Sequence, residues 1–168
     1  FCMVDVNQVG LKITPEFARQ LVEKGDVIKQ AADAQLKVQH PEEPTFNHIE
    51  YVMFTDEYEE DGKRICKNAT LIYPGRVDRS PCGTGTSSRM AVMYAKGQLK
   101  DTDKIYTESI IGGRFEDTIA GTVKMSDGRT AIIPRLKGRA WIYNLEYIGV
   151  DPSDPFQTGY MMSDTWGP

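Results

Sequence analysis

The sequence predicts an α+β domain in which two helices and a hairpin precede a run of antiparallel strands. Three observations lead to this class. Apolar residues recur at spacings near 3.6 residues in 15–37 and again in 86–96, which is typical of amphipathic helices. Residues 105–150 contain β-rich runs separated by turn residues. At 168 residues, the chain is long enough to bury one core and short for two domains.

The first element expected is a strand at 1–6, FCMVDV, which has no polar residues before it. A strand that starts this abruptly indicates that the chain is a fragment or a cleaved product. The helix at 15–37 comes next, because Thr14 is a suitable N-cap and Pro15 suits the first helical position. Gly25 weakens this helix without ending it.

The middle of the chain predicts a hairpin followed by a long loop. Residues 48–55 and 65–73 have the composition of strands, and the acidic stretch 56–64 between them is expected to be a long polar loop. Glycine and proline punctuate residues 74–85, so this segment is expected to be a second loop that leads into the next helix.

The second helix is expected to end at Gly97, which suits a C-terminal cap. A tail rich in Pro and Asp follows the last strand. The strands expected between this helix and the tail lie at 105–111, 116–125, 130–136 and 139–150.

Composition excludes several classes of partner. The hydrophobic content of 40% and charged content of 26% are usual for a globular protein. A net charge of −4 is the wrong sign for a nucleic-acid-binding domain. No apolar stretch reaches the roughly 18 residues that a membrane-spanning helix needs. We therefore expect neither nucleic acid nor a membrane as a partner.

The cysteines and histidines do not form a metal motif. Cys2, Cys66 and Cys82 are an odd number without regular spacing, which suits a reducing compartment better than a disulfide framework. His40 and His48 flank an acidic Pro-Glu-Glu-Pro stretch and have no converging ligands. We expect no metal site and a cytoplasmic location, with a targeting signal upstream of the first residue as the open alternative.

The most informative segment is DRSPCGTGTSS at 78–88, which leads directly into the second helix. The small residues after Cys82 allow backbone amides to converge, and such a nest at a helix start binds an anion such as a carboxylate. The same helix field stabilises the thiolate of Cys82. Asp78 could hold a cation. A thiolate, an anion site and a cation site together suit an α-amino acid, with the thiolate as a base for the α-proton.

Simpler interpretations of the same residues stay open at this point. A Gly-Thr-Gly loop before a helix is often only a tight turn with capping hydroxyls, and a free cysteine is more often a small buried hydrophobe than a catalyst. A phosphate-binding loop is less favoured because the Lys of the GxxxxGK[ST] pattern is missing. Cys2 and Cys66 lie on expected strands and are interpreted as structural.

DRSPCGTGTSSRMA at 78–91 resembles the C-terminal active-site motif of the proline racemase family, which includes hydroxyproline epimerases and trans-3-hydroxyproline dehydratases. The resemblance covers nearly the whole chain. Diaminopimelate epimerase has a similar Cys-Gly-Thr-Gly core, but the preceding Arg-Ser-Pro belongs to the proline racemase pattern. The other segments similar to the family lie at 40–57, 108–115, 129–142 and 151–156.

The resemblance implies a fold as well. It is the diaminopimelate-epimerase type, with two similar α+β halves, each an antiparallel sheet wrapped around a central helix. Residues 1–150 would be the C-terminal half, and the tail 151–168 would pack on the N-terminal half. That half, which carries a Met-Cys-Gly-His motif in the family, would be supplied in cis or by a second chain. A homodimer is also compatible with the family.

The resemblance further implies a mechanism without pyridoxal phosphate, metal or other cofactor. One thiolate removes the α-proton of the amino acid, and an opposing thiol protonates the other face. Cys82 would be one of these catalytic thiols, and Asp78 would hold the ring nitrogen of the substrate. The backbone amides of Gly83 and Thr84 would bind its carboxylate, while Thr86 would cap the helix.

Position 82 distinguishes the activities within the family. The dehydratase branch resembles RSPTGSG here, with Thr in place of the cysteine, so Cys82 favours racemisation or epimerisation over dehydration. Proline and 4-hydroxyproline are both open as substrates, with a slight preference for 4-hydroxyproline. A third hypothesis is an amino-acid-binding half-domain that does not turn over substrate by itself.

Overall fold

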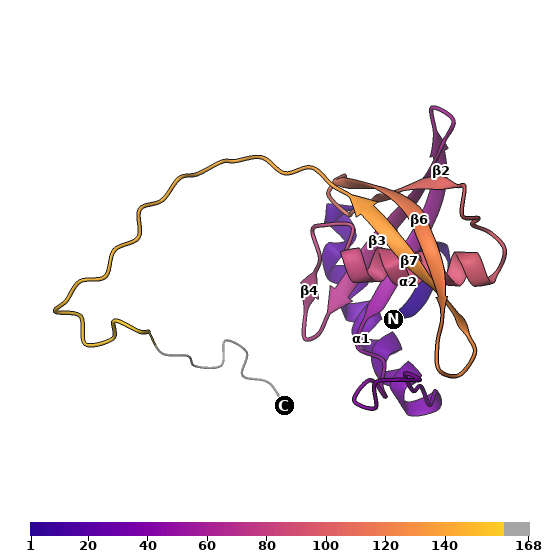
Figure 1. Cartoon of the computed structure of the whole chain (residues 1–168), viewed down its shortest axis with the longest axis horizontal. Helices are drawn as coiled ribbons and strands as arrows, with labels where there is room; N and C mark the ends of the chain where they lie inside the picture. Colours follow the sequence, from indigo (N-terminus) through magenta and orange to yellow (C-terminus); the bar gives the residue numbers. More distant parts are fainter. Residues whose placement is uncertain (160–168) are drawn as a thin grey trace.

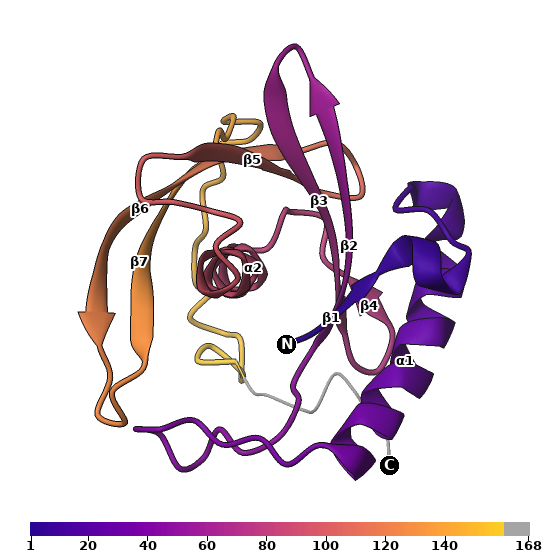
Figure 2. The same cartoon turned by 90° about the vertical axis from the view of Figure 1, so that its right-hand side faces the viewer.

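Helix α2 (Gly83–Ala95) lies inside a strongly curved sheet, and helix α1 (Ala18–Gln35) lies on the outside of that sheet (Figures 1 and 2). The structure is a computed structural model and describes residues 1–159. The remaining elements are β1 Cys2–Asp5, η1 Val6–Val9, η2 Pro15–Phe17, β2 Val52–Glu60, β3 Lys63–Ile72, β4 Arg76–Val77, β5 Lys104–Glu108, β6 Arg114–Lys124 and β7 Thr130–Lys137.

The sheet has the strand order β1-β2-β3-β5-β6-β7, with β4 paired to β3. Pairings β2–β3, β3–β4, β5–β6 and β6–β7 are antiparallel, whereas β1–β2 and β3–β5 are parallel. The predicted α+β class, with a sheet around a central helix, is confirmed. The sheet is mixed, however, because the segment that contains α1 joins the parallel neighbours β1 and β2, and the segment that contains α2 joins the parallel neighbours β3 and β5.

Both faces of the central strands are buried, which explains the near-continuous buried run in β3. Ala69 and Leu71 point toward α1, and the alternate residues Cys66, Asn68 and Thr70 lie on the side of α2. The core on the α1 side contains Val6, Ile13, Leu21, Val52, Phe54, Ala69, Leu71 and Ile110. The core around α2 contains Cys66, Met90, Met93, Leu99, Ile105 and Ile119.

The long polar loop predicted at 56–64 is wrong. Strands β2 and β3 continue through the acidic stretch and meet at a two-residue turn, where Asp61 and Gly62 have φ angles of 50° and 70°. Asp-Gly is a favoured pair for such a hairpin turn. Charges of opposite sign face each other across the strands, as Glu59 and Arg64 do, and Arg64 also forms a diagonal ion pair with Glu57 at 2.9 Å. The charged residues of 56–64 therefore belong to the arm of a hairpin, although their composition is also typical of a polar loop.

The two helices differ from their predicted bounds at their starts. Residues 15–17 form a 3₁₀ turn, and α1 itself begins at Ala18 and ends at Gln35. Helix α2 begins at Gly83, three residues before the prediction, so that Cys82 is its N-cap. Gly97 follows the C-cap with a φ of 70°, in agreement with the predicted role of a glycine at this end.

The strand predicted at 139–150 is wrong. All of residues 138–159 are described, and none of them belongs to a helix or strand; the segment leaves the sheet after β7 and extends away from it (Figure 1). Its large side chains are exposed, including Trp141 at 72% and Tyr147 at 105%. The β propensity is present in the sequence, but no neighbouring strand pairs with it.

No helix among residues 1–159 has the length and apolar character needed to cross a bilayer.

Gly25 is the contact point between α1 and the sheet, which leads to a stability prediction. A Cβ at this position would lie 1.9 Å from Leu71 Cδ1, on a side chain that is itself buried. We expect Gly25→Ala to lower the free energy of unfolding by about 1–3 kcal/mol through overpacking. Urea denaturation followed by circular dichroism measures this.

Lys24→Ala on the exposed face of the same helix is the control, with an expected change within about 0.5 kcal/mol. Helix propensity alone predicts that alanine stabilises position 25. A Gly25→Ala variant more stable than the parent would therefore contradict the packing argument.

Candidate active site

Cys82 sits at the start of α2 in an unusual backbone conformation. Its φ is 64° and its ψ is 108°, a region that non-glycine residues rarely occupy and that costs about 1–3 kcal/mol. Its sulfur accepts a hydrogen bond from the backbone N–H of Gly85 at 3.3 Å. The side chain is 8% exposed. The cysteine therefore acts as the N-cap and points its sulfur at the positive end of the helix.

Hydrogen bonds from three directions fix the loop before this cysteine. The carbonyl of Pro81 accepts from Asn68 Nδ2 at 3.3 Å and from Thr86 Oγ1 at 3.1 Å. The N–H of Cys82 donates to Ser80 Oγ at 3.0 Å. Because these partners come from β3, α2 and the loop itself, they hold the strained residue in place.

Asp78 and the first turn of α2 complete the loop. The N–H of Asp78 donates to the carbonyl of Thr70 at 2.9 Å, and its carboxylate accepts from the N–H of Ser80 at 2.8 Å. Gly83 and Thr84 are exposed, and their N–H groups belong to the first helical turn, where no carbonyl of the helix can accept from them. Thr84 Oγ1 lies 3.6 Å from the sulfur of Cys82. All four predicted site residues are thus within one loop and one helix start.

Thr86 does not have its predicted role as the helix cap. Cys82 caps the helix, and the buried Thr86 hydroxyl donates to the Pro81 carbonyl and lies 3.4 Å from Thr107 Oγ1. Thr107 Oγ1 in turn donates to Asp117 Oδ2 at 2.8 Å. Burial raises the pKa of Asp117 to about 6. A chain of buried polar groups therefore extends from β6 to the cysteine loop.

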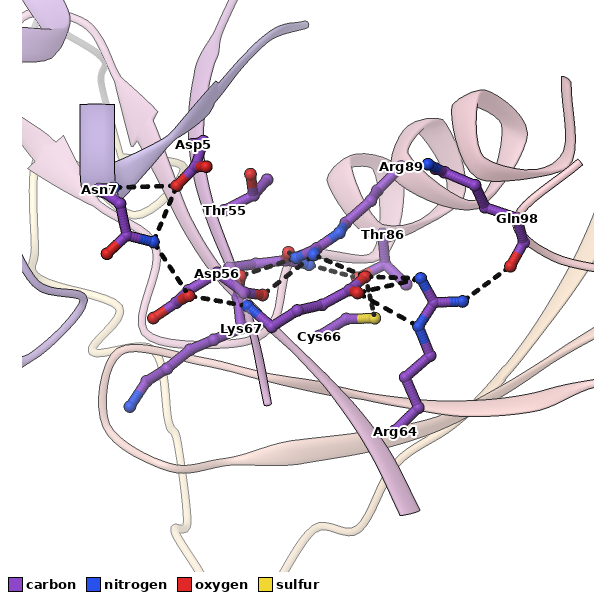
Figure 3. A network of polar contacts seen from close by, with 12 residues as sticks. Asp5, Asn7, Thr55, Asp56, Arg64, Cys66, Lys67, Thr86, Arg89 and Gln98 are labelled. Atoms are coloured by element: carbon purple, nitrogen blue, oxygen red, sulfur yellow. Dashed lines mark hydrogen bonds and ion pairs between the residues drawn. The ribbon is translucent and has the colours of Figure 1, made fainter. Parts of the chain in front are cut away.

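A second network connects the loop to a buried arginine, Arg89, and Figure 3 shows polar side chains around this arginine. Arg89 of α2 is 7% exposed and donates to Asn68 Oδ1 at 2.7 Å, to the carbonyl of Lys67 at 2.8 Å and to the carbonyl of Asp56 at 3.0 Å. The positive charge of the guanidinium is balanced by the Glu57 carboxylate, whose Oε1 lies 3.4 Å from Arg89 Nη2. Arg89 thereby orients the Asn68 amide, whose other end holds the Pro81 carbonyl.

The sequence interpretation did not identify Arg89 or Asn68. Two features of the sequence point to these residues. Arg89 is a charged residue on the helix that follows the motif, and Asn68 is a polar residue within a largely apolar strand. A buried guanidinium must be paired, so a functional constraint could have been suspected there.

The other cysteines and the histidines lie elsewhere. Cys66 is fully buried among the core residues of α2, and burial raises the pKa of its thiol to about 11, which keeps it protonated. Cys2 lies half-buried on β1. His48 is paired with Glu50 at 2.6 Å. Within residues 1–159, no group of three or more His, Cys, Asp or Glu side chains is arranged to hold a metal ion.

Comparison with known proteins identifies the family. The sequence model described as Proline racemase matches residues 1–161. The chain belongs to the proline racemase family. Curated relatives named 4-hydroxyproline 2-epimerase, from Allorhizobium ampelinum and Agrobacterium fabrum, are each 40% identical to it. The matches cover 99% and 100% of this chain but 47% and 48% of those proteins, so the chain spans about half their length.

Solved structures of the family give the same picture. The chain superposes on a hydroxyproline epimerase from Agrobacterium vitis, crystallised with trans-4-hydroxy-L-proline, with a TM-score of 0.77 and 41% identity. A probable proline racemase from Agrobacterium radiobacter, crystallised with carbonate, also gives 0.77, at 39% identity. The alignments cover 98% and 99% of this chain and 46% and 48% of those chains. The fold is therefore that of one half of the family's enzymes.

Asp117 leads to a prediction about pH. Because its pKa is raised to about 6, Asp117 keeps its proton to a higher pH in the folded state than in the unfolded state. The protonated carboxyl therefore contributes fully to the free energy of unfolding below about pH 4, and this contribution is lost as the pH rises through 6. The Asp117→Asn variant does not lose stability in this way, because an asparagine amide does not ionise. The difference in unfolding free energy between Asp117→Asn and the parent should rise by about 2 kcal/mol between pH 4 and 7.

Urea denaturation at several pH values measures this difference, and any constant offset from the new amide cancels in the comparison. The exposed Asp101→Asn variant controls for the loss of one negative charge. A difference that stays flat across this range would show that Asp117 ionises normally in the folded protein.

Proposed function

We propose that this chain forms the half of a cofactor-independent amino-acid racemase or epimerase that carries Cys82 as a catalytic thiol. The observation that carries the proposal is the position of this sulfur. It lies at the N-terminus of α2, accepts the Gly85 N–H, and is followed by the exposed backbone amides of Gly83 and Thr84. A thiolate is stabilised in such a position and can act as a base.

The proposed reaction is a balanced transfer of two protons. The Cys82 thiolate takes the α-proton and becomes a thiol, leaving a carbanion whose charge is delocalised into the carboxylate. A thiol of the other half gives its proton to the opposite face of the α-carbon and becomes a thiolate. The next turnover in the reverse direction restores both groups, so no cofactor is required for the proton balance.

The neighbouring groups supply binding and charge stabilisation. The N–H groups of Gly83 and Thr84 bind the substrate carboxylate and stabilise the negative charge that develops on it. The carboxylate of Asp78, at the other end of the loop, binds the positively charged ring nitrogen of the substrate. Proline and 4-hydroxyproline both fit this description, and the names of the curated relatives favour 4-hydroxyproline.

Two other functions make different predictions. A trans-3-hydroxyproline dehydratase needs only one thiol base, and Cys82 in place of that branch's threonine disfavours it. A binding half-domain without turnover is the other alternative, because this chain spans about half the length of its relatives.

Exchange of the α-proton tests the catalytic role of Cys82. The complete protein, with both halves present, is incubated in deuterium oxide with L-proline or trans-4-hydroxy-L-proline, and NMR follows the α-proton. We expect exchange with inversion for at least one substrate, and a loss of at least about a thousandfold in Cys82→Ser because a hydroxyl is a far poorer base.

Cys2→Ala is the matched control and should retain the parental rate, since this cysteine lies on β1 and packs against the core on the α1 side of the sheet. Full activity in Cys82→Ser would refute the catalytic assignment. A cyclic imine product would indicate the dehydratase, and binding without exchange would indicate the binding half-domain.

We also propose that the segment after β7 packs on the other half of the enzyme. The half-domain is expected to end at residue 150, yet the segment without helix or strand starts at Gly138. It includes the large apolar side chains that are more than 70% exposed, namely Trp141, Ile142, Tyr143, Leu145, Tyr147 and Ile148. Residues 151–159 continue the same segment, and residues 160–168 of the predicted tail lie outside the described part of the chain. Apolar side chains so fully exposed are typical of an interface whose partner is elsewhere.

Hydrogen exchange tests this packing. In the complete protein, the amides of 139–150 should exchange at least about tenfold more slowly than an unstructured peptide, because pairing with the other half protects them. Residues 37–39, which are exposed and lie outside any helix or strand, are the internal control and should exchange quickly. Unprotected amides in 139–150 would contradict the proposed packing.

A further inference from the structure

The hydroxyl of Thr70 is a buried polar group without a partner. Thr70 is 2% exposed, and among residues 1–159 its Oγ1 is one of only two buried side-chain oxygen or nitrogen atoms that have no hydrogen bond. Its carbonyl, in contrast, accepts from the N–H of Asp78. Native proteins rarely leave a buried hydroxyl unpaired, and such groups often mark a functional position.

This hydroxyl faces the space beside Gly85, and so does the sulfur of Cys82. A Cβ at Gly85 would lie 3.0 Å from Thr70 Oγ1, 3.1 Å from Cys82 Sγ and 3.0 Å from Met53 Sδ. Glycine at position 85 therefore leaves open the space between the hydroxyl and the sulfur. Any larger residue would fill it.

The charge state of Cys82 determines whether the hydroxyl has a partner. A neutral thiol is a weak acceptor and already receives the Gly85 N–H. A thiolate is a much stronger acceptor and attracts further donors, and hydrogen bonds to an ionised group are about twice as strong as neutral ones. The Thr70 hydroxyl can rotate, and it is a buried donor near the sulfur that no other group uses. The Thr84 hydroxyl also lies 3.6 Å from the sulfur, but on an exposed residue.

We propose that Thr70 is a positioning residue whose hydroxyl turns toward Cys82 when the sulfur is ionised and stabilises the thiolate. Its importance for turnover rests on the proposed function, but its effect on the thiolate does not. The charged or titratable groups that reach this loop through the described contacts are Asp78 in the loop, Arg89 on α2 and Asp117 on β6. None of them is altered by a change at Thr70.

The test compares Thr70→Val, which keeps the shape and removes the hydroxyl, with Thr70→Ser, which keeps the hydroxyl. The complete protein is treated with iodoacetamide from pH 5 to 9, and mass spectrometry follows alkylation of the Cys82 peptide. In Thr70→Val the pH midpoint should rise by about half a unit to one unit, lowering the rate at neutral pH by about three- to tenfold. Thr70→Ser should stay within about twofold of the parent.

Thermal unfolding separates this role from a structural one. An unpaired buried hydroxyl does not stabilise the fold, so Thr70→Val should have a melting temperature equal to or above that of the parent. Thr55→Val on neighbouring β2, whose hydroxyl donates to the Val4 carbonyl at 3.3 Å, is the matched control and should leave the alkylation midpoint unchanged.

An unchanged midpoint in Thr70→Val, or the same shift in Thr70→Ser, would overturn the proposal. The outcome is independent of the proposed function. If the midpoint moves while the parent does not exchange the α-proton of either amino acid, Thr70 still tunes the thiolate and the proposed function is wrong. If the parent exchanges that proton while the midpoint stays, the proposed function stands and the role of Thr70 is wrong.

Discussion

The site depends on two hydrogen bonds to the Pro81 carbonyl, which come from different elements of the fold. Asn68 reaches it from β3 and Thr86 reaches it from α2, so the loop cannot move without separating helix from sheet. Arg89 fixes the other end of the Asn68 amide. The sheet curves around α2, and the buried hydrogen bonds between the sheet and α2 fix the position of the helix relative to the strands. Apolar packing alone would specify this position less precisely.

The curvature of the sheet explains why polar groups gather there. Strands β2 and β3 have a helix on each face, and the face toward α1 is filled with aliphatic and aromatic side chains. The face toward α2 instead carries Asn68, Thr70 and Thr107 close to the helix start. Burying a polar group costs free energy unless the group is hydrogen-bonded, so the packing of the sheet on this end of α2 depends on the hydrogen bonds between these polar residues.

The sequence predicted the helices, the α+β class and the loop that carries Cys82, because periodicity and an unusual motif are local signals. It did not predict the Arg89–Asn68 contact, since the two residues are brought together only when β3 packs on α2. It did not predict the hairpin arm, because a run of charged residues has the composition of a polar loop and only its pairing with a second strand identifies it as a strand. The strand expected at 139–150 needs a neighbour, and pairing is a property of two segments that no single segment reveals.

The backbone of Cys82 has a consequence for how activities can diverge on this fold. A φ of 64° is tolerable for an unbranched side chain held by its neighbours, but for a β-branched one it is a severe conflict. Exchanging Cys82 for the threonine expected of the dehydratase branch would thus change the shape of the loop as well as its chemistry.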